Sequence, residues 1–128
     1  MFNWRRPTNL GVTNGRFAPC KRSPNCVSSQ ADPADREHYI APLSFKGSIA
    51  GLRAAIEALP LVRVVRETQD YLYAEFRTPL LRFVDDVEFL QEGNLLHVRS
   101  ASRLGRRDFG TNRRRVEELR AYLKPPSP

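Results

Sequence analysis

Residues 81–120 read LRFVDDVEFLQEGNLLHVRSASRLGRRDFGTNRRRVEELR, and this stretch predicts a β-hairpin, a short basic loop and a helix. The alternation of apolar and polar residues over 81–89 is typical of a half-buried strand. A second strand is predicted after a turn at residues 92–93, with Leu96 and Val98 on its apolar side. An even-residue loop keeps the two apolar faces together, so the hairpin is predicted to cover one side of a hydrophobic core.

Two adjacent carboxylates in the first of these strands point to opposite faces of the hairpin. The predicted register places Asp85 opposite Ser100 on the apolar face, and Asp86 opposite Arg99 on the outer face. A carboxylate on the core side of a strand has to be hydrogen-bonded, paired with an opposite charge or placed where the core meets solvent. Burying an unpaired carboxylate costs free energy. Asp85 is therefore expected to belong to a polar network.

Arginines crowd the loop and the first turn of the final helix: Arg103, Arg106, Arg107, Arg113, Arg114 and Arg115. Positive charges at a helix N-terminus oppose the helix macrodipole, so nearby negative charges should offset them. Asp108 near the cap, Asp85 or Asp86 from the sheet, or an external anion could do this. Two interpretations stay open. The arginines either extend into solvent and pair with acidic neighbours, or they bind an anionic ligand or partner.

Composition limits the classes of protein that fit. A chain of 128 residues with 41% hydrophobic and 27% charged residues suits one soluble domain with a modest core. The net charge of +7 favours an acidic partner, whether nucleic acid, an anionic membrane or a charged small molecule. No apolar run is long enough to span a bilayer and no secretory signal is visible, so we expect a cytoplasmic protein.

The chain divides by composition into three parts. Residues 1–17 are expected to form an irregular N-terminal arm, residues 18–124 a single α+β domain, and residues 125–128 a tail. Within the domain, residues 18–41 are rich in Pro, Asn and Ser, and we expect them to form a loop segment that contains both cysteines.

The remaining pattern predicts an α+β fold. Strands are expected at Pro42–Lys46, 61–66, 71–78 and in the hairpin, and helices from Ser48 to Pro60 and from Asn112 to Lys124. The order β-α-β-β-β-β-α predicts a single five-stranded antiparallel sheet with two helices packed on one face. This arrangement resembles the TATA-binding-protein-like fold, of which helix-grip folds are elaborations.

The cysteines, Cys20 and Cys26, leave several chemistries open. A local disulfide is sterically plausible, and reduced buried thiols or a reactive thiol next to basic residues are the alternatives. A structural zinc site needs four ligands, and only His38 and His97 remain to complete one. We therefore expect no metal, and the absence of a cofactor-binding motif predicts no cofactor.

Three strings in the sequence resemble a known family. They are APCKRSPNCVSS at residues 18–29, RFVDDVEF at 82–89, and VRSASR at 98–103 with its continuation to Asp108, Gly110, Asn112 and Arg113. Over residues 18–123 the chain resembles the family called domain of unknown function 1499, found in bacteria and plant plastids. The resemblance implies no activity. It does imply that the cysteine segment and the Asp-Arg-Ser-Asn segments belong to one pattern.

Two functional classes have weaker support. An enzyme could use Cys26 or Ser100 as nucleophile and His38 or His97 as base, but no catalytic motif backs this choice, so we do not favour an enzyme. A nucleic-acid-binding protein could use an outward sheet face with Tyr71, Tyr73, Arg77, Arg82, Arg99 and Arg103. Glu75, Asp86 and Glu88 share that face and would repel phosphates.

The class we prefer is a non-catalytic binding or scaffold module. Its polar network is predicted to comprise Asp85, Asp86, Arg99, Ser100, Ser102, Arg103, Asp108, Asn112 and Arg113. Such a network could fix how the basic loop and final helix dock on the sheet. It could instead shape a pocket for a small anion or for an acidic protein partner.

Overall fold

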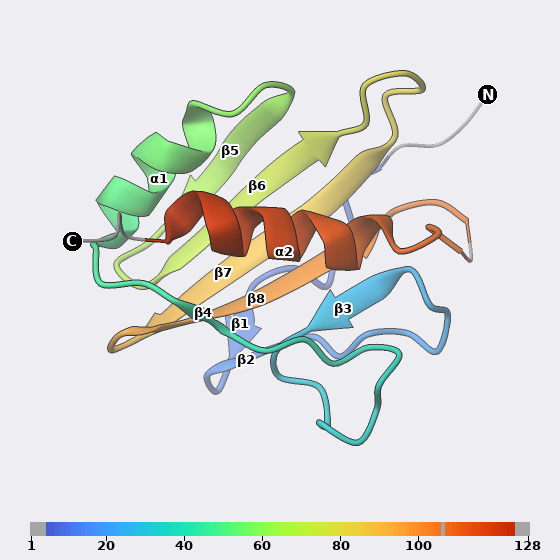
Figure 1. Ribbon diagram of the computed structural model, residues 1–128, viewed down its shortest axis with the longest axis horizontal. Helices are drawn as coiled ribbons and strands as arrows, with labels where there is room; N and C mark the ends of the chain where they lie inside the picture. The colour runs from blue at the N-terminus through green and yellow to red at the C-terminus, as the bar shows by residue number, and fades with distance from the viewer. Residues whose placement is uncertain (1–4, 106, 125–128) are drawn as a thin grey trace.

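The computed structural model describes residues 5–105 and 107–124 of the chain. The first four residues of the predicted arm, Arg106 of the basic cluster and the predicted tail at 125–128 lie outside the described residues. The elements in chain order (Figure 1) are β1 (Val12–Thr13), β2 (Arg16–Phe17), β3 (Cys26–Ser28), β4 (Leu43–Ser44), α1 (Ile49–Glu57), β5 (Val62–Glu67), β6 (Tyr71–Arg77), β7 (Val84–Glu92), β8 (Leu95–Ser102) and α2 (Thr111–Leu123).

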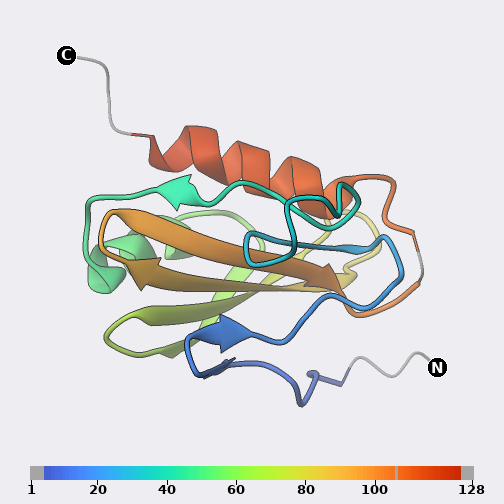
Figure 2. The same cartoon turned by 90° about the horizontal axis from the view of Figure 1, so that it is seen from below.

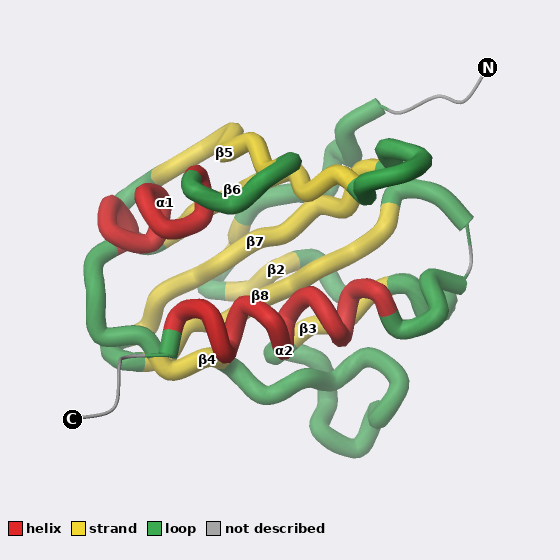
Figure 3. Tube along the Cα trace, turned by 45° about the horizontal axis from the view of Figure 1, so that its top comes forward, coloured by secondary structure: helices red, strands yellow, loops and turns green. Residues whose placement is uncertain are grey.

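The centre of the molecule is a six-stranded sheet with the order β3-β8-β7-β6-β5, in which β4 also pairs with β8. All of its strand pairs are antiparallel. The two helices cover one face of the sheet, and the N-terminal arm with its β1-β2 hairpin covers the other (Figure 2). The helices divide their face between them, since α1 lies over β5 and β6 while α2 lies over β8 and β3 (Figure 3).

The prediction of five strands and of irregular structure before residue 42 was wrong. β3 has three residues, too few for an alternating pattern to be visible, yet it pairs with the end of β8 while β4 pairs with its beginning. The expected irregular arm also contains the β1-β2 hairpin. This hairpin turns at Asn14 and Gly15, whose positive φ angles of 53° and 74° suit the two-residue Asn-Gly turn.

The predicted register of the β7-β8 hairpin was wrong by two residues. Glu92 pairs with Leu95 across the Gly93-Asn94 turn, so Asp85 lies opposite Ser102 and Asp86 opposite Ala101. A shift of two residues keeps every side chain on its predicted face, because side chains alternate with a period of two. The faces were therefore predicted correctly and the cross-strand partners were not.

The main core lies between the sheet and the two helices. It contains Leu72, Ala74 and Phe76 of β6, as predicted, packed with apolar residues of both helices. Tyr71 and Tyr73 face away from this core, as the alternation predicted, but they do not form the open platform that the nucleic-acid-binding alternative required. Tyr71 and Tyr73 are 5% and 1% exposed, because Phe17 and Leu10 of the arm pack against them in a second apolar cluster.

Both helices begin close to where the sequence predicts. Ser48 caps α1, and its Oγ accepts a hydrogen bond from the backbone N–H of Gly51. At α2 the N-cap is Gly110, which has φ of 81° and provides no side chain to cap the helix. The carboxylate of Asp108 replaces it by accepting hydrogen bonds from the N–H groups of Gly110 and Asn112.

Candidate functional site

Asn112, in the first turn of α2, is the centre of a polar network on the helix side of the sheet. The residue is fully buried. Its Oδ1 accepts a 2.6 Å hydrogen bond from Ser100, and its Nδ2 donates to Ser102 at 2.8 Å and to Asp108 at 2.7 Å. Nδ2 also lies 3.2 Å from the carbonyl oxygen of Asn25. Every polar atom of this side chain is therefore used to hold α2 against β8 and β3.

Asp85 belongs to the same helix-side network. It is 2% exposed, and its Oδ2 lies 2.6 Å from Nη1 of Arg115. Burial raises the pKa of Asp85 above its usual range, although the charge of Arg115 and a hydrogen bond from Ser102 oppose that rise. The carboxylates of Asp85 and Asp108 thus supply the negative charge that the arginines at this helix N-terminus require.

Arg113 does not join this network. Its Nη2 donates to the carbonyl oxygens of Tyr39, Arg36 and Glu37 at 2.9, 3.1 and 3.3 Å. These contacts fasten the loop before β4 to α2. Nη2 of Arg113 therefore binds backbone carbonyl oxygens.

A second polar network lies on the opposite face of the sheet, beneath the arm. Arg103 donates through Nε to Asp86 at 3.0 Å, and its Nη2 lies 2.9 Å from Asp86 and 2.5 Å from Glu75. Tyr73 donates its hydroxyl to Asp86, and Arg6 of the arm pairs with Glu75 at 2.9 Å. Burial would raise the pKa of Glu75, but the hydrogen bonds from Arg103 and Arg6 outweigh it and lower the pKa.

Glu88 and Arg99 extend this arm-side network along the sheet. Glu88 is fully buried and accepts hydrogen bonds from the Tyr71 hydroxyl at 2.6 Å and from the Gly11 N–H at 2.7 Å. Its Oε2 lacks a hydrogen-bond partner among the described residues and lies 3.7 Å from Nη1 of Arg99. Burial raises the pKa of Glu88 and lowers that of Arg99. Arg99 also donates to the Ala18 carbonyl at 2.8 Å.

A cavity of about 560 Å³ opens beside this network, between the arm, the cysteine loop and the end of β8. We call it the arm pocket, and its lining residues are Arg5, Pro7, Thr8, Asn9, Lys21, Ser23, Asn25, Cys26, Asp86, Arg99, Ala101, Ser102, Arg103 and Gly105. Five residues selected from the sequence meet here: Cys26, Asp86, Arg99, Ser102 and Arg103. The sequence reasoning missed Arg5 and Lys21, since the placement of the arm depends on long-range contacts.

The residues named as catalytic candidates are all engaged in other interactions. Cys26 forms a disulfide with Cys20 in the structure. Ser100 is fully buried and donates to Asn112. The ring of His38 lies between Asp35 Oδ2 at 2.8 Å and the Ser23 carbonyl at 3.0 Å. No thiolate or activated hydroxyl is presented to a cavity by these three side chains.

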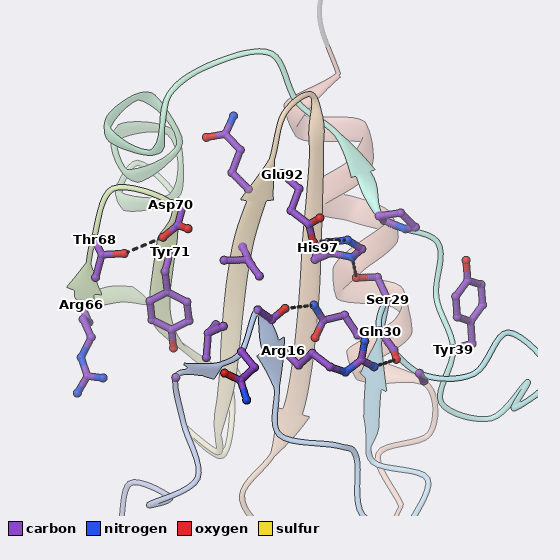
Figure 4. Close-up of a pocket in the computed structure, with 18 of the residues that line it drawn as sticks. Arg16, Ser29, Gln30, Tyr39, Arg66, Thr68, Asp70, Tyr71, Glu92 and His97 are labelled. Atoms are coloured by element: carbon purple, nitrogen blue, oxygen red, sulfur yellow. Dashed lines mark hydrogen bonds and ion pairs between the residues drawn. The ribbon is translucent and has the colours of Figure 1, made fainter.

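His97 lines a larger, open cavity of about 1040 Å³ at the other end of the arm (Figure 4). Its Nε2 is 3.2 Å from Glu92 and its Nδ1 is 3.0 Å from Ser29 Oγ. A serine, histidine and carboxylate in contact suggest a catalytic relay. However, Ser29 is buried, and its Oγ also accepts the N–H of Val98, which extends the pairing of β3 with β8. This arrangement is sufficiently explained by strand pairing.

The family model described as Protein of unknown function (DUF1499) matches residues 16–123, which include the helix-side network and the strand residues of the arm-side network. The chain belongs to this family. Membership in DUF1499 confirms the resemblance predicted from the sequence. No curated protein and no solved structure matches the chain significantly. The DUF1499 match begins at Arg16, so Arg5 and Arg6 of the arm lie before it.

Two further observations concern the residues that the structure describes. Within residues 5–105 and 107–124, no three His, Cys, Asp or Glu side chains cluster in a way that could hold a metal ion. Over the same residues, neither helix is long and apolar enough to cross a bilayer.

Proposed function

We propose that this protein is a non-catalytic binding module whose arm pocket takes a small anion. The observation that carries the proposal is the charge of the lining. Arg5, Lys21, Arg99 and Arg103 line the cavity, with Asp86 as the carboxylate among its described lining residues. Glu75, Asp86 and Glu88 offset the charges of Arg99 and Arg103, so the lining keeps a positive charge through Arg5 and Lys21. Its volume of about 560 Å³ is suitable for a small molecule. Phosphate, sulfate and carboxylate groups are the ligand chemistries that clustered arginines and lysines bind.

Pre-organisation supports the same conclusion. Arg103 is held by Asp86 and Glu75, and Arg99 by Glu88 and the Ala18 carbonyl. Such fixed guanidinium groups lose little side-chain entropy when a ligand binds.

The test uses two substitutions with the same charge change. Lys21→Gln removes a cation from the arm pocket, whereas Lys46→Gln removes an exposed cation in the segment between β4 and α1. Inorganic phosphate, sulfate and citrate are titrated at constant ionic strength, with chloride as the reference, and binding is followed by calorimetry and thermal unfolding. We expect Lys21→Gln to weaken binding about tenfold, equivalent to roughly 1.4 kcal/mol, and Lys46→Gln to leave it unchanged.

Equal weakening in both variants would show that net charge alone attracts the anion. The absence of binding by the unmodified protein would overturn the proposal. Retained binding in Lys21→Gln together with retained stability would place the anion elsewhere.

A further inference from the structure

Two loops expose large apolar side chains at one end of the molecule. Leu80 and Leu81, in the β6-β7 loop, are 90% and 65% exposed, and Phe109, in the β8-α2 loop, is 87% exposed. Figures 1 and 2 both show these loops at the same end, where β8 ends and α2 begins. Such a group of exposed leucine and phenylalanine side chains is uncommon on a protein surface that meets only water.

The described residues of the two loops are neighbours. They line a common groove of about 400 Å³, to which Phe83 contributes from one loop and Leu104 and Phe109 from the other. The backbone of Arg82 and that of Phe109 have positive φ angles of 57° and 53°, which non-glycine residues rarely adopt. Strain of this kind persists where the surrounding structure imposes it, and it is frequent at binding surfaces.

Asp108 fixes the backbone on both sides of Phe109. Its side chain accepts hydrogen bonds from the N–H groups of Gly110 and Asn112, and its backbone carbonyl accepts one from the N–H of Thr111. Phe109 lies between these residues, so its position at the start of α2 is set by the cap of the helix.

The charges around these side chains are positive. Arg82 and Arg107 are exposed, one in each loop. Between residues 78 and 83 there is no acidic residue, and Asp108 is the one acidic residue between 103 and 110. Because Asp108 is engaged with the N-terminus of α2, its charge is offset. The surface thus combines protruding apolar side chains with a cationic rim.

We propose that this end of the molecule docks on an anionic phospholipid membrane, with Leu80, Leu81 and Phe109 entering the acyl boundary. Arginines beside them would then lie at the level of the lipid phosphates, which is the arrangement of peripheral interfacial segments. Apolar side chains on separate loop tips suit a fluid lipid surface better than one rigid partner surface. The proposal uses none of the cations of the arm pocket, so it stands independently of anion binding there.

The experiment is co-sedimentation of the purified protein with vesicles. Vesicles of phosphatidylcholine with phosphatidylglycerol are compared with vesicles of phosphatidylcholine alone. We expect binding to the anionic vesicles, and a loss of at least tenfold in partition for Leu80→Ser/Leu81→Ser and for Phe109→Ser. These variants keep the net charge of +7, so the loss would report apolar insertion and not electrostatic attraction.

Leu95→Ser is the matched control, because Leu95 is another exposed leucine, at 46%, in the β7-β8 hairpin. It should partition like the unmodified protein, and thermal unfolding should show that all variants are folded. Equal partition of all variants would overturn the proposal, as would failure of the unmodified protein to bind anionic vesicles. Self-association that Phe109→Ser abolishes, without vesicle binding, would assign the surface to a second copy of the chain and also overturn it.

Discussion

Asp85 lies on the core side of β7 and is balanced by one guanidinium group, that of Arg115 at 2.6 Å. We expect Asp85→Ala to lower the free energy of unfolding by about 3–5 kcal/mol, because the substitution leaves Arg115 largely buried without its partner charge. Urea unfolding followed by circular dichroism measures the change. Arg114→Ala is the control, since this exposed neighbour should alter the free energy of unfolding by less than about 0.5 kcal/mol.

A neutral Asp85→Ala would mean that the α2 N-terminus docks on the sheet without this ion pair. A large loss in Arg114→Ala would show instead that the exposed arginines stabilise the fold as a group.

Strand alternation predicted the face of each polar residue but not its partners. It placed Asp85 and Ser100 on one face and Asp86 and Arg99 on the other, as the structure has them. These four residues were predicted to form one network, whereas in the structure the sheet separates them into two networks, one on each face. Partners such as Arg115 come from segments whose approach depends on tertiary packing, and no local pattern encodes that approach.

The disulfide between Cys20 and Cys26 connects the segment that follows the arm to β3, and so to the edge of the main sheet. Closing a loop this short is expected to stabilise the fold by about 2 kcal/mol. Cys20→Ser/Cys26→Ser should therefore unfold at lower temperature than the unmodified protein. Reductant should lower the unfolding temperature of the unmodified protein to the same level, and leave that of the variant unchanged. An effect of reductant on the variant would contradict this account.

The long elements could be predicted because their signals are local. Strand β6 and helix α1 show clear periodicity, and α1 also has the Ser48 cap and the Pro60 stop. The Asn14-Gly15 turn was a usable hairpin signal that the sequence reasoning did not apply. β3 offers no such signal, because three residues become a strand only when they pair with the end of β8. The burial of the outer sheet face likewise follows from the path of the arm.

The buried titratable groups of the whole molecule respond to pH in two opposite ways. Burial raises the pKa values of Asp85 and Glu88. Burial would lower the pKa of His38, but hydrogen bonds to the Ser23 carbonyl and to Asp35 raise it overall. Groups with a raised folded-state pKa stabilise the fold at low pH, and this contribution is lost as the pH rises through the folded-state value. Glu75 has a lowered pKa, so its contribution is lost as the pH falls.

The directions of these pKa shifts predict that the free energy of unfolding is greatest on the acid side of neutrality. On going from pH 8 downward, protonation of His38, Glu88 and Asp85 favours the folded state, and the free energy of unfolding should rise. At still lower pH the ion pairs of Glu75 should be lost, and the free energy of unfolding should fall again. Urea unfolding from pH 3.5 to 8.5 should therefore show a maximum below neutrality. His38→Gln/Glu88→Gln should flatten the alkaline side of that profile. A maximum above pH 7 in the unmodified protein would contradict the raised pKa values of these three groups.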